Sequence, residues 1–204
     1  MAQTIPIPVH VADANSDSGA DADALLAQVR ACTLCAQALP HAPRPVLQYH
    51  PQARILIVGQ APGSRVHASG VPFDDASGNR LREWMGVDRE TFYDQRLVAL
   101  LPMGFCYPGS GKSSSGKSSS GKSSSGKSGD LAPRRECAPA WRERLLAGLV
   151  NIQLTLVVGQ YAKAWHLPQS AALNVTDTVK AWRDYGSAIF AAAASKPAQQ
   201  HLVD

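Results

Sequence analysis

Long hydrophobic runs are missing from this sequence. No stretch of about 18 uninterrupted apolar residues occurs, which excludes a transmembrane helix of the usual length. The N-terminus also lacks the basic start and apolar stretch of a secretory signal, so we expect a cytoplasmic protein without a membrane partner. Aromatic residues make up only 6% of the chain, yet 45% of its 204 residues are hydrophobic. That content is enough for one domain with a packed core.

Outside one repeat, the sequence also has no excess of charge of either sign. The formal net charge is +4, but four of the 20 basic residues lie in a Gly-Lys-Ser repeat that contains no acid: Lys112, Lys117, Lys122 and Lys127. The remaining 16 basic residues balance the 16 acidic ones. The pI near 9.0 therefore does not by itself predict a nucleic-acid-binding surface.

The chain divides into a leader, a domain and an insertion. Residues 1–23 carry scattered Pro, Asp, Ser and Ala without a sustained apolar period, which predicts a disordered leader. The domain is expected over residues 24–204. Residues 109–129 interrupt it with the Gly-Lys-Ser repeat, which has no apolar residue to bury and predicts a flexible insertion.

The repeat formally matches the phosphate-binding pattern G-x-x-x-x-G-K-S, for example from Gly111 to Ser118. A phosphate-binding loop of this kind needs a strand that enters it and a helix that leaves it. Neither flank is predicted here, and any repeat of period five that contains Gly-Lys-Ser satisfies the pattern. We therefore expect no nucleotide at the repeat.

Short apolar runs that end in glycine predict a parallel sheet. Residues 55–58 run into Gly59, and residues 154–158 run into Gly159. Residues 97–101 are typical of a further strand, whereas residues 25–29, 81–87, 141–149 and 161–165 favour helices. This alternation predicts an α/β fold with helices on both faces of the sheet, in which ligands bind beyond the carboxyl ends of the strands.

Four cysteines are the only ones in the chain: Cys32, Cys35, Cys106 and Cys137. The first two form a C-x2-C turn, and disulfides are disfavoured in the cytoplasm. Three interpretations remain open, namely buried free thiols, a zinc site and an iron–sulfur cluster. Four thiolates suit zinc and an iron–sulfur cluster equally well on ligand count.

Together, these motifs resemble the uracil-DNA glycosylase superfamily, in particular its iron–sulfur family 4 type and relatives. The resemblance covers residues 29–185 and depends on the following segments: Cys32-Thr33-Leu34-Cys35, Gly59-Gln60-Ala61-Pro62-Gly63, Gly70-Val71-Pro72-Phe73, Ser77-Gly78-Asn79-Arg80-Leu81, Cys106 and Cys137. It implies a three-layer α/β/α sandwich around a mainly parallel sheet. It also implies hydrolysis of the N-glycosidic bond of a base that has been flipped out of DNA containing uracil or a damaged base.

The resemblance also implies roles for individual residues. The backbone of Gly59, Ala61, Pro62 and Gly63 would approach the base and sugar, and Gln60 would orient the attacking water. Phe73 would stack on the flipped base, and Asp75 would stabilise positive charge on the sugar or activate water. Structural alternatives are a polar loop residue for Gln60, a core residue for Phe73 and a helix N-cap for Asp75.

The resemblance further implies that Cys32, Cys35, Cys106 and Cys137 hold a structural [4Fe–4S] cluster, with zinc as the alternative. We expect the protein to be a monomer.

Two departures from the family pattern point to weakened activity. Pro102 stands four residues before the third cysteine, where family 4 enzymes have an Asn that reads the uracil edge. The family's His-Pro-Ser type motif is replaced by residues 189–197, and His201-Leu202 does not match it. Loss of one anion-stabilising donor costs about 100-fold to 1000-fold in rate.

We also expect a final strand and helix to be missing, which would expose a sheet edge. Two other functions therefore stay open beside the glycosylase: a non-catalytic module that binds nucleic acid, and a metal-stabilised α/β domain without a role on DNA.

Overall fold

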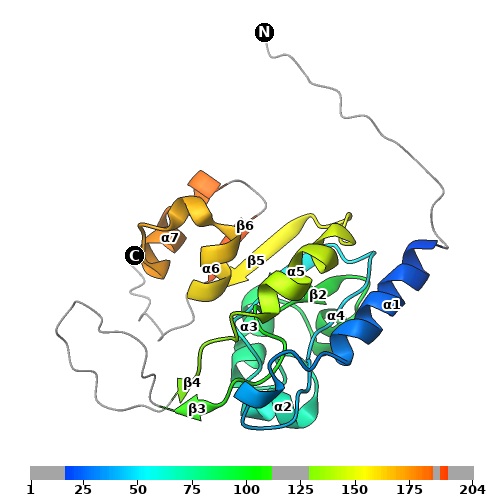
Figure 1. Ribbon diagram of the computed structural model, residues 1–204. Coiled ribbons are helices and arrows are strands. Elements are labelled where there is room, and N and C mark those ends of the chain that lie inside the picture. The colour runs from blue at the N-terminus through cyan, green and yellow to red at the C-terminus, as the bar shows by residue number, and fades with distance from the viewer. Residues whose placement is uncertain (1–16, 112–128, 186–188, 193–204) are drawn as a thin grey trace.

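The computed structural model describes residues 17–111, 129–185 and 189–192 (Figure 1). Helix α1 spans Asp17–Arg30, so it begins well before the predicted start of the domain at residue 24. Ala22 is buried in the same core cluster as Leu26 and Val29, so the apolar face of α1 begins inside the predicted leader. Residues 17–23 of that leader are thus helical.

A parallel sheet lies at the centre of the fold, as predicted. Its strands are β1 (Ile55–Val58), β2 (Val98–Leu100), β5 (Leu154–Val158) and β6 (Ile189–Ala192). Their order is β2-β1-β5-β6, and every neighbouring pair is parallel. The expectation that a final strand is missing was wrong, because β6 pairs with β5 from Thr155↔Ile189 to Val158↔Ala192.

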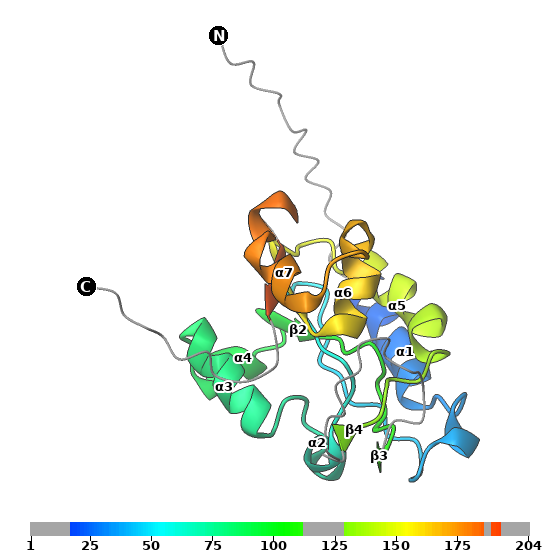
Figure 2. The same ribbon diagram turned by 90° about the vertical axis from the view of Figure 1, so that its left-hand side faces the viewer.

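Helices cover both faces of the sheet, which confirms the three-layer arrangement. Successive strand residues point to opposite faces. Leu56 and Val58 accordingly pack with α1 and with α5 (Cys137–Ala147), whereas Ile57 packs with α3 (Ala76–Met85) and α4 (Arg89–Tyr93). Figure 2 shows α3 and α4 on one side of the sheet and α1 and α5 on the other.

The remaining elements are short. They are η1 (Ala36–Ala38), α2 (Ser64–Ser69), α6 (Gln160–His166), η2 (Pro168–Ser170), α7 (Val175–Lys180) and η3 (Trp182–Tyr185). Helix α6 begins directly after Gly159, which has a φ of 89°. Glycine tolerates this left-handed conformation, which explains why the β5 run ends in glycine.

A small hairpin closes the base of the predicted insertion. Strands β3 (Ser110–Gly111) and β4 (Gly129–Asp130) pair antiparallel. Its predicted bounds, 109–129, thus include residues that belong to the hairpin. The repeat itself, residues 112–128, lies outside the described residues.

The replaced C-terminal motif falls largely outside the described residues. Strand β6 occupies Ile189–Ala192, whereas residues 193–197 and His201 belong to the part that is not described. Over the described ranges, we found no helix with the length and apolar character needed to cross a membrane.

Candidate active site and cysteine-lined cavity

The turn after β1 lies at the carboxyl edge of the sheet, where the chain also leaves β2. The backbone N–H of Met103 donates to the Gly59 carbonyl at 2.9 Å, and that of Gly104 donates to the Gln60 carbonyl at 3.0 Å. These bonds join the exits of two neighbouring strands. The predicted substrate turn, residues 59–63, is therefore fixed to the segment that leads to Cys106.

Gly59 and Phe73 come into close contact. A Cβ atom added at Gly59 would lie 3.1 Å from Cζ of Phe73, so a side chain there would require the ring to shift slightly. Pro62 is buried, whereas Ala61 and Gly63 are half-buried. At Gly59, the turn thus presents backbone rather than a side chain to the ring.

Phe73 has an unusual backbone conformation. Its φ is 55°, and it is the only non-glycine residue of the described chain with a positive φ. A bulky residue in this region is strained, and such strain is concentrated at functional sites. The ring is half-buried and meets Phe92 edge to face at a centroid distance of 6.2 Å. Phe73 therefore contacts the core at one side while part of its ring stays accessible.

Contacts with helix α3 fix the backbone of Phe73. A Cβ atom at Gly78 would collide with the Phe73 carbonyl, so only glycine allows the helix to come this close. Arg82 also donates to the Phe73 carbonyl, at 3.4 Å. These contacts hold the strained conformation in place.

Asp75 is the N-cap of α3, which confirms its structural alternative. Its Oδ1 accepts hydrogen bonds from the Gly78 N–H at 2.9 Å and from the Ser77 hydroxyl at 2.6 Å. Its Oδ2 lies near the turn, 3.9 Å from the position that a Cβ atom would occupy at Gly63. The neighbouring Asp74 instead pairs with Arg89 at 2.9 Å. Asp75 is thus the carboxylate of this pair that reaches the turn.

Sequence reasoning missed a second carboxylate at the same turn. Oδ2 of Asp130 lies 3.0 Å from the position of a Cβ atom at Gly63. Partial desolvation, and to a lesser degree the charge of Asp75, raises the pKa of Asp130. Asp130 follows the repeat directly and belongs to no motif that was recognised, so only its pairing in the β3–β4 hairpin brings it here.

Gln60 is held by the segment after Asp130. Its Nε2 donates to the Leu131 carbonyl at 3.3 Å, and the Leu131 N–H donates to the Gly109 carbonyl at 2.8 Å. The hairpin thus covers the Gly59–Gly63 turn. Pro102, at the position where the family pattern has Asn, is buried and offers no side-chain donor.

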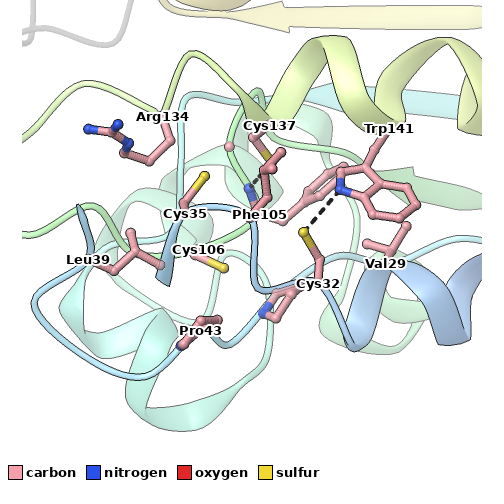
Figure 3. Close-up of a pocket in the computed structure, with 13 residues that line it drawn as sticks. Val29, Cys32, Cys35, Leu39, Pro43, Phe105, Cys106, Arg134, Cys137 and Trp141 are labelled. Carbon is pink, nitrogen blue, oxygen red and sulfur yellow. Dashed lines mark hydrogen bonds between the residues drawn. The ribbon is translucent and has the colours of Figure 1, made fainter. Parts of the chain in front are cut away.

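The four cysteines line one cavity, although they come from three distant segments (Figure 3). Cys32 and Cys35 lie in the turn after α1, Cys106 follows β2, and Cys137 is the first residue of α5. Trp141 and Arg134 lie at opposite sides of the cavity in Figure 3. The structure therefore brings together the residues predicted as metal ligands.

Two of the four cysteine sulfurs accept an N–H hydrogen bond. The indole Nε1 of Trp141 donates to Cys32 Sγ at 3.3 Å, and the backbone N–H of Phe105 donates to Cys137 Sγ at 3.4 Å. Hydrogen bonds of this kind stabilise thiolates and tune the metal groups that they hold.

Burial disfavours the deprotonated form of three of the four thiols. Burial raises the pKa of Cys137 to about 12, and it also raises the pKa values of Cys35 and Cys106. A thiol binds metal only after it loses its proton, so metal binding would release protons here. In the described ranges, 17–111, 129–185 and 189–192, no three His, Cys, Asp or Glu side chains are arranged to hold a single metal ion.

A family model matches most of the chain. Described as the uracil DNA glycosylase superfamily, it matches residues 47–202, which include the Gly59 turn, Phe73, Asp75 and Asp130. Cys32 and Cys35 precede the matched region, so membership of the iron–sulfur family 4 type stays a prediction. By this match, the chain belongs to the uracil-DNA glycosylase superfamily.

Proposed function

We propose that this protein hydrolyses the N-glycosidic bond of uracil, or of a related damaged base, in DNA. The observation that carries the proposal is the arrangement at the Gly59 turn, where a half-exposed aromatic ring and two carboxylates surround bare backbone. Superfamily membership supports a glycosylase activity in the broad sense. The choice of uracil and of DNA as substrate is part of the proposal.

Phe73 would receive the flipped base. A base inside the DNA stack cannot be reached by an enzyme, so it must be extruded first. Stacking on an aromatic ring stabilises an extruded base by about 1–3 kcal/mol. The fixed backbone of Phe73, held by Gly78 and Arg82, keeps the ring in one orientation and lowers the entropic cost of binding.

The two carboxylates would act on the sugar and on water. As the bond between C1′ and the base breaks, its electron pair leaves with the base and positive charge develops on the sugar. Asp75 would stabilise this charge. Asp130 would accept a proton from the water that attacks C1′, and Gln60 would orient that water.

We also propose that Cys32, Cys35, Cys106 and Cys137 hold a [4Fe–4S] cluster. The four cysteines line one cavity, and N–H hydrogen bonds to two of the sulfurs suit thiolates. The choice of the cluster over zinc rests on the resemblance of Cys32-Thr33-Leu34-Cys35, Cys106 and Cys137 to the family 4 pattern. When bound, the cluster would tie the Cys32–Cys35 turn to β2 and α5.

The test is release of base from a uracil-containing single-stranded oligonucleotide by protein purified without oxygen. Alkali-labile abasic sites are scored against a matched oligonucleotide with thymine at the same position. We expect abasic sites only with uracil, and only in slow turnover because Pro102 cannot donate to the base edge. A folded, metal-loaded protein that binds both oligonucleotides equally and cleaves neither would contradict the proposal and favour a non-catalytic binding module.

A further inference from the structure

Three rings form a cluster that the proposed chemistry does not use. His41 stacks on His67 at a centroid distance of 5.2 Å and on Tyr107 at 6.0 Å, with interplanar angles of 24° and 18°. His67 and Tyr107 also contact each other, at 5.8 Å. His41 is exposed, whereas His67 is half-buried and Tyr107 is buried. The two more buried rings therefore support an exposed ring from the protein side.

His67 contributes to this cluster as a neutral ring. Burial, followed by the positive charges of His41 and Arg44, lowers the pKa of His67 below its ordinary 6.5. Its Nδ1 is buried and has no hydrogen-bond partner among the described residues. A neutral imidazole of this kind packs as an aromatic ring. His67 thus provides a stacking surface for His41.

An open groove of about 440 Å³ adjoins the rings. Its lining includes His41, Tyr107, Pro40, Gly109, Ser110 and Leu131. Gly109 has a φ of 99°, and a Cβ atom there would lie 3.2 Å from Cγ of Pro40 and 3.5 Å from Cδ1 of Leu131. Glycine thus lets the segment after η1 and the hairpin approach each other. The volume falls in the usual range of sites for small ligands, about 300–1,000 Å³.

The groove and the rings are joined to the Gly59–Gly63 turn. The Leu131 carbonyl, in a residue that lines the groove, accepts the hydrogen bond from Gln60 Nε2 at 3.3 Å. His67 lies on α2, and its N–H donates to the Gly63 carbonyl at 2.8 Å. Figures 1 and 2 both show α2 and the β3–β4 hairpin at the same end of the molecule. The groove is therefore continuous with the proposed active site.

Arg44 adds positive charge beside the rings. Its Nη1 donates to the carbonyls of His67 at 2.6 Å and of Ala68 at 2.8 Å, which fixes the guanidinium against α2. Among the described residues, Arg44 belongs to none of the ion pairs. Because Arg44 is exposed and has no carboxylate partner there, its charge can attract a phosphate.

We propose that the groove beside His41 binds a nucleotide that neighbours the flipped base in single-stranded DNA. The inference rests on the proposed function, because it takes DNA as the substrate. The base of this nucleotide would stack on His41, and Arg44 would contact its phosphate. An aromatic surface beside a cation suits single-stranded DNA, because every base has a stacking face and every nucleotide carries a phosphate. Both residues bind substrate in this account and take no part in bond hydrolysis.

The test measures binding of three thymine oligonucleotides that carry one uracil at the centre, at the 5′ end or at the 3′ end. Fluorescence anisotropy with full-length protein, read before uracil is released, gives the Kd of each. A groove on one side of the flipped base should make the wild type bind one end-uracil oligonucleotide more tightly than the other. His41→Ala should weaken binding of that oligonucleotide and of the central one by about 10-fold, and leave the third unchanged.

Two further variants serve as controls for the stacking. His41→Phe keeps a flat ring over His67 and Tyr107, so it should retain the preference of the wild type. Trp84→Ala removes a ring that is exposed on α3, and it should bind all three oligonucleotides as the wild type does.

Arg44→Gln tests the phosphate contact separately. Loss of one phosphate contact should reduce the slope of log affinity against log salt by about 0.7 for a single strand. Gln keeps a side-chain donor for the α2 carbonyls. Arg96→Gln removes an exposed arginine before β2, at the opposite edge of the sheet, and should leave the slope unchanged.

The outcomes separate the groove from the reaction. Equal binding of both end-uracil oligonucleotides by the wild type would overturn the groove, and so would an equal effect of His41→Ala on all three. An unchanged salt slope in Arg44→Gln would overturn the phosphate contact. If the wild type releases uracil but His41→Ala binds as the wild type does, the groove alone fails. A folded wild type that neither binds the oligonucleotides nor releases uracil would instead overturn the proposed function.

Discussion

The cysteine-lined cavity and the Gly59 turn lie at the same edge of the sheet but are built differently. The cavity has N–H hydrogen bonds to two of its sulfurs, and its cysteines keep ordinary backbone conformations. The turn is flanked by two carboxylates and by Phe73, which has a strained φ of 55°. Hydrogen bonds to sulfur stabilise thiolates, whereas strain and paired acids are typical of a site that performs chemistry. The comparison supports the proposal of a structural role for the first region and a catalytic role for the second.

Removal of one cysteine should have the largest effect. Cys137→Ala would delete a ligand that joins α5 to two distant segments, so we expect loss of bound metal and a large drop in the thermal midpoint. Metal analysis and thermal unfolding measure both. Thr33→Ala, an exposed change inside the Cys32–Cys35 turn, is the control and should keep the metal. Full metal content in Cys137→Ala would contradict a structural metal site in the cysteine-lined cavity.

The pH dependence of stability tests the burial of His166, which lies on α6. Burial and Arg142 lower the pKa of His166 from 6.5 to about 4. The folded state therefore resists protonation, so stability is complete above pH 6.5 and is lost as the pH falls towards 4, by about 3 kcal/mol in total. Urea unfolding of His166→Gln should lack this loss, whereas exposed His41→Gln should retain it. An unchanged pH profile in His166→Gln would contradict the burial of a neutral imidazole.

Phe73→Ala tests the second region. Loss of base stacking, about 1–3 kcal/mol, should weaken selective binding of uracil-containing DNA by about 10-fold to 100-fold and leave metal content unchanged. Fluorescence anisotropy with matched oligonucleotides measures the effect. Trp84→Ala removes an aromatic side chain that is 61% exposed on α3 and should leave binding unchanged. Metal loss in Phe73→Ala would show that the two regions are not independent.

Of these effects, the change in stability caused by Asp130→Asn should be the smallest. The folded state raises the pKa of Asp130 above its ordinary 3.8, so it holds a proton that the unfolded chain releases. Stability from this group is present below pH 3.8 and is lost as the pH rises through the raised pKa. Asn does not titrate, so Asp130→Asn should lack this pH-dependent loss of stability. The variant should therefore unfold at a slightly higher urea concentration than the wild type at about pH 7 but not at about pH 3. Exposed Asp184→Asn should show no such difference, and a lower midpoint for Asp130→Asn at neutral pH would contradict the assignment.

The sequence predicted the fold, and the grouping of the four cysteines, better than the surroundings of the Gly59 turn. Buried strands such as Ile55–Val58 show themselves as apolar runs that end in glycine, and the four cysteines stand out by residue type. Asp130 gave no such signal, because its place depends on β3–β4 pairing across the repeat. The burial of Arg142 on α5 gave none either, since one arginine in a helix of mixed composition is expected to be exposed until the packing is known.

The same limit applies at the two ends of the domain. Helix α1 begins at Asp17 because alanine favours helix, and the burial of Ala22 in the core is set by tertiary packing. Strand β6 was not expected, because Ile189–Ala192 is short and ends in alanine, so its pairing with β5 is set by tertiary structure.

Uracil release by the wild type and by an Asp75→Asn, Asp130→Asn double variant tests the central claim most directly. Asn is also a good N-cap, so α3 should stay intact in the variant. In single-turnover assays at equal metal content, the wild type should release uracil and the double variant should be slower by about 100-fold or more. Equal rates in the two proteins, or no release by a folded, metal-loaded wild type, would contradict the assignment of the chemistry to the Gly59 turn.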